Sequence, residues 1–286
     1  MNAPRLITMD MLQQPRTMTH SVVPAVYETD DEIIERMRLK FSIQDEMTRA
    51  VKRGDVNAMI ISGPPGVGKS YGVEHVLSKH DMLADIAGDP SLRKYEIVKG
   101  AMSALGLYCK LHEFKDSKSI VVFDDCDSIL FDDLSLNILK AALDSGNKRM
   151  ISWYTDSRLL KDESIPNTFE FKGGCIFITN IKFDHVKSKK LRDHLEALES
   201  RCHYLDLTID TEREKMLRIK QIVNDGMLDK YEFDEGVAEE IVDFVDRHKD
   251  RMRELSLRMI LKVADLRKSM PLSWEQVSEI TCMRRK

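Results

Sequence analysis

Eight residues, Gly63-Pro-Pro-Gly-Val-Gly-Lys-Ser70, lie between a short apolar run at 58–61 and a predicted helix. The pattern G-x-x-x-x-G-K-[ST] in this setting is typical of a loop that binds phosphate. Glycines let backbone N–H groups approach phosphate oxygens, and the positive end of the helix that begins at Lys69 points at the same anion. We expect Lys69 to reach the β- and γ-phosphates of a nucleotide and the Ser70 hydroxyl to ligate Mg²⁺.

A second apolar run, Ile120-Val-Val-Phe123, ends in two carboxylates, Asp124 and Asp125. A buried strand delivers such side chains to its carboxyl end, where ligands bind in parallel sheets. We expect Asp124 to hold the Mg²⁺ shell and Asp125 to orient an attacking water. The phosphate loop by itself does not separate ATPases from GTPases or P-loop kinases.

Apolar strand-like runs alternate with helix-like segments through the first two thirds of the chain. Strands are expected near 58–61, 95–98, 120–123, 175–179 and 204–207, with helices near 31–53, 69–79, 101–112, 134–143 and 191–198. This alternation predicts an α/β fold in which helices cover both faces of a parallel sheet. Two further strand-like runs, 149–155 and 168–172, predict a β-hairpin inserted at 149–172.

The strand signal ends after Asp210, and helices are expected near 211–224, 234–247, 253–268 and 273–281. Residues 1–30 hold three prolines among polar residues, which predicts an extended arm. The expected organisation is therefore an arm at 1–30, an α/β nucleotide-binding core at 31–209 and a small all-α domain at 210–286.

Composition excludes several classes of protein. The net charge of −4 argues against a protein that coats polyanions. The five cysteines form no CxxC pair, so neither a zinc site nor a disulfide framework is indicated. No apolar run approaches the ~18 residues that a membrane span needs, and the amino terminus lacks the apolar region of a secretory signal. We expect a cytoplasmic protein without a membrane partner.

At this point the chain resembles the AAA+ ATPases, from about residue 30 to 270. Gly63–Ser70 is similar to their Walker A motif and Val121–Asp125 to Walker B. The second Walker B acid is usually Glu, whereas Asp125 is one methylene shorter, so slower hydrolysis or a role for Asp127 stays open. Ile176–Asn180 resembles sensor 1, which implies that Asn180 lies near the γ-phosphate.

The resemblance also implies an arginine finger and a second sensor. Ala197–Cys202 is similar to the segment that carries the finger, with Arg201 as first candidate and Arg192 as second. Leu255–Ile260 resembles sensor 2, with Arg258 touching the nucleotide from a helical lid at 210–286. The implied protein has the P-loop NTPase fold, hydrolyses ATP with Mg²⁺ and forms a homo-oligomeric ring, with a hexamer expected. The implied nucleotide-binding residues of the loop are Gly63, Pro64, Pro65, Gly66, Val67, Gly68, Lys69, Ser70 and Tyr71.

The substrate of such a motor stays open. Lys99–Met102 matches the position of the first pore loop but lacks the aromatic residue that grips unfolded polypeptide. The hairpin at 149–172 is similar to the pre-sensor-1 hairpin of helicase-like members, where Trp153 and Tyr154 either stack on a base or pack the hairpin against the sheet. A nucleic-acid or nucleoprotein motor of bacterial or phage type, a protein remodeller, and a nucleotide-gated assembly switch are the three hypotheses, with a P-loop kinase as the outside alternative.

Overall fold

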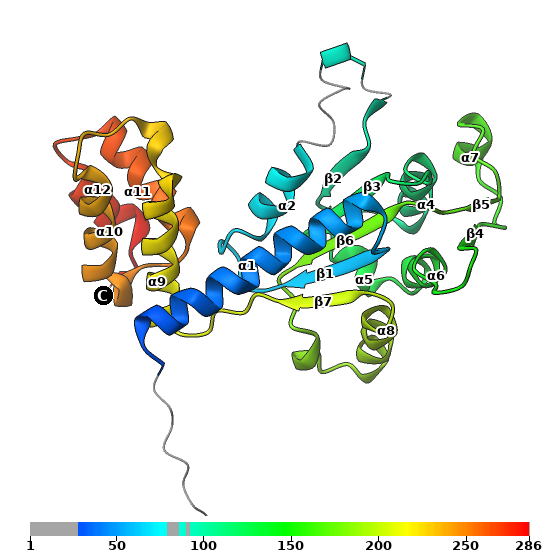
Figure 1. The fold of residues 1–286 in the computed structure, drawn as a ribbon, viewed down its shortest axis with the longest axis horizontal. Helices are drawn as coiled ribbons and strands as arrows, with labels where there is room; N and C mark the ends of the chain where they lie inside the picture. Colours follow the sequence, from blue (N-terminus) through cyan, green and yellow to red (C-terminus); the bar gives the residue numbers. More distant parts are fainter. Residues whose placement is uncertain (1–27, 79–85, 90–91, 286) are drawn as a thin grey trace, which may run out of the picture.

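The computed structural model describes residues 28–78, 86–89 and 92–285, so most of the expected arm and Lys79 lie outside the described residues. In this part of the chain, five parallel strands form one sheet in the order β2-β3-β6-β1-β7 (Figure 1). The strands are β1 (Ala58–Ser62), β2 (Tyr95–Lys99), β3 (Ile120–Asp124), β6 (Gly174–Thr179) and β7 (His203–Asp206). The expected α/β architecture with a parallel sheet is confirmed.

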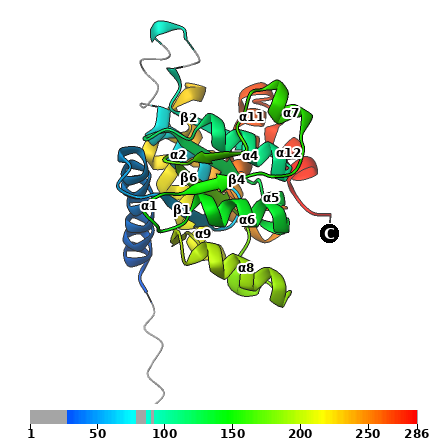
Figure 2. The same cartoon turned by 90° about the vertical axis from the view of Figure 1, so that its right-hand side faces the viewer.

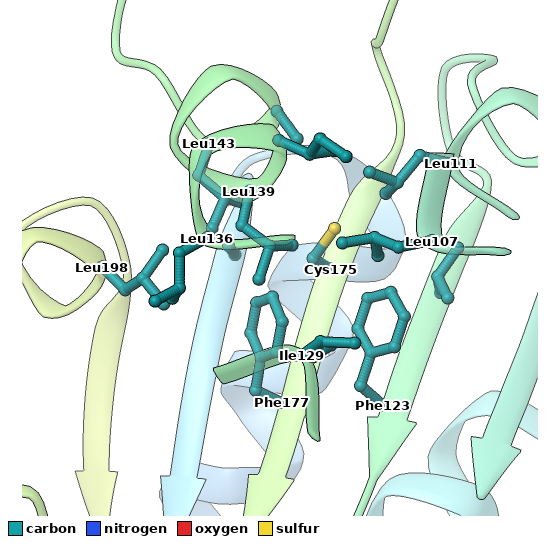
Figure 3. Packing of buried hydrophobic residues seen from close by; sticks show 14 of the residues in the cluster. Leu107, Leu111, Phe123, Ile129, Leu136, Leu139, Leu143, Cys175, Phe177 and Leu198 are labelled. Carbon is teal, nitrogen blue, oxygen red and sulfur yellow. The ribbon is translucent and has the colours of Figure 1, made fainter. Parts of the chain in front are cut away.

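Helices cover both faces of the sheet, and alternate residues of each strand pack on opposite helix layers. Both faces of the sheet are therefore buried and carry apolar side chains. Ile60, Phe123 and Phe177 face α4 (Ala104–Glu113), α5 (Ser128–Phe131), α6 (Asp133–Ala142) and α8 (Lys189–Glu199). Figure 3 shows Phe123 and Phe177 among the leucines of these helices. Ile61 and Val122 face the other way, toward α1 (Asp30–Arg53) and α2 (Lys69–Ser78). Figure 2 shows α1 on one side of the sheet and α4 and α6 on the other.

The long helix α1 begins and ends with the capping signals that its sequence carries. Thr29 and Glu32 form a capping box, and Gly54 takes the left-handed conformation, with φ of 82°, just after Arg53. The helix begins at Asp30, so the expected arm does not include that residue. Gln44 donates a 2.8 Å hydrogen bond to the Lys69 carbonyl, which ties α1 to the start of α2.

The expected hairpin is present as β4 (Met150–Ser152) paired antiparallel with β5 (Thr168–Glu170). The connecting segment holds a short helix, α7 (Arg158–Asp162), where only a polar loop was expected. The buried guanidinium of Arg149 donates to the carbonyls of Ala142 and Gly173, so the base of the hairpin is fixed to the core.

Residues from 212 onward form a helical unit with its own apolar core. Its main helices are α9 (Glu212–Ile222), α10 (Val237–Arg247), α11 (Leu257–Ser269) and α12 (Trp274–Cys282), and Figure 1 shows them grouped beyond one end of the sheet. The helix expected at 253–268 begins four residues later, because Arg253 N–H bonds the Cys282 carbonyl and Ser256 caps the helix. Within the described part of the chain, every helix is too short or too polar to span a membrane.

Candidate functional site

The Gly63–Ser70 loop connects β1 to α2 at the carboxyl edge of the sheet. Gly66 and Gly68 have φ of 73° and 104°, in the region that L side chains rarely adopt. Val67 is buried against Ile33 and Ile209, which anchors the middle of the loop. The loop is therefore a fixed turn whose last two residues, Lys69 and Ser70, begin helix α2, as the motif requires.

The ammonium group of Lys69 is buried at the centre of the site, with the residue only 6% exposed. Its Nζ donates to Gly63 O at 2.6 Å, to Pro64 O at 2.8 Å and to Asn180 Oδ1 at 2.8 Å. Burial lowers the pKa of Lys69 to about 8, against the opposing effect of Asp125 and Asp124. The lysine is thus held at the loop by three acceptors that use all of its protons.

Asp124 ends β3 with a buried carboxylate that two groups approach. Ser70 Oγ donates to Asp124 Oδ1 at 2.9 Å, and Lys99 Nζ lies 3.5 Å from Oδ2. Carboxylate and hydroxyl oxygens are the ligands that Mg²⁺ prefers in proteins. The Ser70–Asp124 pair, expected from the sequence, is therefore assembled, whereas the cation of Lys99 beside it was not foreseen.

Asp125 is exposed and turns the chain out of the strand with φ of 53°. Its Oδ1 accepts a 2.8 Å hydrogen bond from Asn180 Nδ2, so Asn180 joins Lys69 to Asp125. Asp127 is half-buried and accepts a 2.7 Å hydrogen bond from Thr179 Oγ1. Burial raises the pKa of Asp127. The charge of Asp127 raises the pKa of Lys69 less than the charge of Asp125 does. Of the two acids, Asp125 is the one that is open to solvent and linked to Lys69.

The sheet register explains why these distant residues meet. Strand β6 lies between β1 and β3, with Thr179 opposite Ser62 and Ile178 opposite Asp124. Asn180 therefore follows β6 at the same edge where the loop leaves β1 and the acids leave β3.

The helical unit touches the loop directly. Leu257 N–H donates to Gly66 O at 2.9 Å, and a Cβ on Gly66 would lie 2.7 Å from Ser256 Cβ. Arg258 is exposed, with its Cγ 3.7 Å from the same point, and its charge contributes to the lowered pKa of Lys69. The structure thus places Arg258 beside the loop, and its contact with a nucleotide stays a prediction.

Arg201 lies at the other edge of the sheet from the loop. It precedes β7, in which His203 pairs with Met59 near the start of β1 and Asp206 pairs with Ser62 at its end. The three residue steps from His203 to Asp206 span about 10 Å along the strand. Arg201 Nη1 donates to Ala197 O at 2.6 Å, while its buried Nε has no hydrogen-bond partner within the described part of the chain. Within one chain, Arg201 does not join the cluster around Lys69.

The two aromatic residues of the hairpin, Trp153 and Tyr154, differ in how far their side chains are buried. Trp153 is half-buried and packs against Tyr108, with the ring centroids 5.8 Å apart. Tyr154 is 82% exposed. Trp153 therefore packs the hairpin against the core. The ring of Tyr154 is exposed while its hydroxyl accepts a 3.3 Å hydrogen bond from Thr168 Oγ1, and a contact of Tyr154 with a partner stays a prediction.

Tyr71, which the resemblance includes among the nucleotide contacts, is exposed on α2 and stacks on His75 with the ring centroids 6.0 Å apart. The ring of Tyr71 therefore lies on the surface of α2, and its place among the nucleotide contacts stays a prediction.

A cavity of about 630 Å³ lies between α9 and α10, apart from the loop. Six carboxylates line it, together with apolar residues such as Val223 and Phe233. These carboxylates belong to Asp229, Glu232, Asp234, Glu235, Glu239 and Asp243. None of the loop or acidic-edge residues lines this cavity, so it is not part of the candidate site.

Two comparisons with known proteins bear on this chain. No protein-family model matches it. The chain is 33% identical over 260 residues to an uncharacterized 36.7 kDa protein from the nrdC–mobD intergenic region of Enterobacteria phage T4, and the match covers 90% of this chain and 77% of the phage protein.

Proposed function

The chain belongs to the same family as that phage T4 protein, and we propose that it is an AAA+ ATPase with the P-loop NTPase fold. In this proposal it binds Mg-ATP at the Gly63–Ser70 loop and hydrolyses the ATP to ADP and phosphate. It works as a homo-oligomeric ring, with a hexamer expected, in the cytoplasm.

The observation that carries the proposal is the chain of hydrogen bonds from Lys69 through Asn180 to Asp125. Lys69 and Asn180 are 111 positions apart and Asn180 and Asp125 are 55 apart, yet each pair is joined at 2.8 Å. A cation at the phosphate loop, an amide and an exposed carboxylate are the groups that phosphoryl transfer to water needs side by side.

The residues present fit both the nucleotide and the metal. The left-handed glycines let loop amides turn toward an anion. Ser70 and Asp124 offer paired oxygen ligands, which is the donor set of a hard divalent cation. Mg²⁺, when bound, neutralises part of the charge that develops on the phosphate oxygens.

The side chains of this protein divide the remaining work. Lys69 binds and orients the β- and γ-phosphates with protons that it now donates to Gly63 and Pro64. Asp125 accepts a proton of the attacking water at a carboxylate oxygen, and Asn180 holds that carboxylate in place. The side chain of Asp125 is one methylene shorter than that of Glu. The left-handed backbone conformation at Asp125, with φ of 53°, therefore determines how far the carboxylate extends into the site.

ATP binding and phosphate release by purified variants test this proposal. Lys69→Ala should weaken ATP binding strongly, whereas Asp125→Asn should bind ATP and release little phosphate. Lys148→Ala, at an exposed lysine in a surface turn, is the matched control and should behave as the parent. An ATP dissociation constant unchanged in Lys69→Ala contradicts the site, and transfer of phosphate to a small acceptor instead of water favours the P-loop kinase alternative.

The role proposed for Arg201 requires a ring. Since it lies at the opposite edge of its own sheet, only a second copy can bring it to a loop. Arg201→Ala and Asp125→Asn should each be nearly inactive, because a finger is worth ~10³–10⁵ in rate. Co-expressed mixed rings should regain activity where an intact Asp125 meets an intact Arg201 from the neighbour. No recovery in verified mixed rings contradicts the role of Arg201 and directs the same test to Arg192.

We propose nucleic acid or a nucleoprotein complex as the substrate, on the strength of the hairpin. Its exposed side chains include Met150, Tyr154 and Leu159, and an exposed aromatic ring is suited to stacking on bases. Stimulation of ATP hydrolysis by single-stranded or duplex DNA supports this substrate. Stimulation by unfolded protein supports a protein remodeller instead, and nucleotide-dependent assembly without turnover supports a switch.

A further inference from the structure

One charged side chain of the helical unit has no role in the site described so far. Arg218 lies in the middle of α9 and is only 7% exposed. Its guanidinium lies over the ring of Phe41 in α1, with Cζ 3.5 Å from the ring centroid. Nη1 donates to Gln221 Oε1 at 3.1 Å, and the buried Nε has no hydrogen-bond partner among the residues that the structure describes.

The charge of Arg218 is poorly balanced by its surroundings. Among the described residues, no carboxylate forms an ion pair with it, and Asp225 is the acid whose charge acts on it. Burial lowers the pKa of Arg218 to about 10, so the side chain stays charged at neutral pH. A buried cation without a paired anion is costly, and an anion that binds beside it lowers that cost.

The guanidinium is aimed at the phosphate loop. Nη2 lies 3.8 Å from the point that a Cβ on Gly68 would occupy, and Leu257 Cδ1 lies 3.7 Å from that point. Gly68 has no side chain to come between them, and its left-handed backbone excludes most residues that would have one. The fork of Arg218 is thus held against the loop from the helical unit.

We propose that Arg218 binds an anionic oxygen of the nucleotide at Gly68 and is a second cation of the helical unit for the polyphosphate, beside Arg258. This inference rests on the proposed ATP site. The stack on Phe41 fixes the plane of the guanidinium in advance, so little side-chain entropy remains to be lost when the anion binds. A planar, pre-oriented fork is suited to phosphate oxygens.

The competing role is structural, in which Arg218 only joins α9 to α1 through Phe41. Arg218→Met separates the two roles because Met keeps much of the length and apolar contact of the stem and removes the charge. Arg218→Lys keeps the charge and loses the fork. Arg267→Met is the matched control, since Arg267 is another arginine of the helical unit beside an aromatic ring, with Cζ 5.9 Å from the Trp274 ring centroid, but it is half-buried and paired with Glu240.

Dissociation constants for ATP, ADP and adenosine, together with melting temperatures with and without ATP, are the measurements. We expect Arg218→Met to weaken ATP and ADP binding about 10- to 100-fold, the effect of a charged hydrogen bond, and to change adenosine binding little. Arg218→Lys should be intermediate and Arg267→Met should match the parent. The nucleotide-free melting temperature of Arg218→Met should hold or rise, because an unbalanced buried charge is removed.

The outcomes separate this inference from the proposed function. If the parent protein binds neither ATP nor ADP, the proposed function fails and the inference fails with it. If the parent binds ATP, Lys69→Ala does not, and Arg218→Met binds like the parent, only the inference fails. A lower melting temperature without nucleotide, combined with unchanged ATP affinity, assigns Arg218 the structural role and also overturns the inference.

Discussion

Asn180 donates its amide proton to Asp125 at 2.8 Å while its carbonyl oxygen accepts from Lys69. One amide therefore holds both the cation of the Gly63–Ser70 loop and the exposed acid that follows the neighbouring strand β3. Because both hydrogen bonds run through a single short side chain, the separation of Lys69 and Asp125 is set by the reach of Asn180.

Asn180→Ala should leave ATP binding within a few-fold of the parent and lower the rate of phosphate release about 10²- to 10³-fold, as for loss of one positioned donor. Steady-state phosphate release and an ATP titration measure the two effects. Asn167→Ala, on the exposed side of the hairpin, is the control and should leave both unchanged. An equal loss in the two variants contradicts the role of Asn180.

Gly66→Ala should displace the helical unit from the loop, because the new Cβ would lie 2.7 Å from Ser256 Cβ and the residue keeps a φ of 73°. We expect faster proteolysis between the sheet and the helical unit, and weaker ATP binding. Ser256→Gly alone should cost only a few tenths of a kcal/mol, since Gly is tolerated at a helix N-cap.

The double variant Gly66→Ala, Ser256→Gly should recover part of the resistance to proteolysis, because the atom that clashes is gone. The strain of the left-handed alanine remains, so recovery is incomplete. Two independent, additive losses in the double variant contradict a contact between these residues.

Glu214 links the helical unit to α1 and gives the fold a dependence on acidic pH. Burial alone raises the pKa of Glu214, but hydrogen bonds from Arg36 and from Thr211 outweigh burial and lower it to about 2. The folded pKa lies below the unfolded value of about 4.3, so the carboxylate stabilises the fold fully above pH ~4.3. That contribution is lost as the pH falls toward 2.

Glu214→Gln should therefore lower the free energy of unfolding by about 2–3 kcal/mol at pH 7 and by much less near pH 2. Urea unfolding at the two pH values measures the difference. Glu212→Gln, at the exposed start of the same helix, should change neither value appreciably. A loss for Glu214→Gln that is the same at both pH values means that the charge of this residue is not what stabilises the fold.

Trp153→Ala should destabilise the protein by about 2–3 kcal/mol, somewhat below the range for a fully buried Trp, because the ring packs on Tyr108. Tyr154→Ala should stay within about 0.5 kcal/mol of the parent, since its ring is exposed. Thermal unfolding of both variants separates the residues. If Tyr154→Ala also keeps DNA-stimulated ATP hydrolysis unchanged, the hairpin tyrosine does not contact the substrate.

The strands were predictable because a strand that is buried on both faces is a continuous apolar run. Ile120–Phe123 and Cys175–Thr179 have that pattern, and the structure extends them only to Asp124 and back to Gly174. The meeting of Lys69, Asp125 and Asn180 was predictable as well, because the carboxyl ends of parallel strands lie at the same edge of a sheet. In contrast, the short helix α7 within the hairpin has too few residues for a periodic signal.

Residues whose role depends on how two elements pack were not predictable. Arg218 belongs to an amphipathic, charge-rich helix, where a single arginine indicates a solvated face, and only the packing of α9 on α1 places it over Phe41. Lys99 likewise meets Asp124 because β2 pairs with β3 in a register that the sequence does not specify. Ser256 and Leu257 reach Gly66 for the same reason.

The hydrogen bond from Leu257 N–H to Gly66 O has a thermodynamic consequence for regulation. Suppose that a ligand binds the loop more tightly when the helical unit is in one position than in another. Linkage then requires that binding of the ligand favours that position of the helical unit by the same factor. A neighbouring subunit or client that shifts the helical unit must then change nucleotide affinity by the same factor by which nucleotide changes the affinity for that partner. If the protein assembles as proposed, nucleotide affinities measured on the isolated chain differ from those in the assembly by that coupling factor.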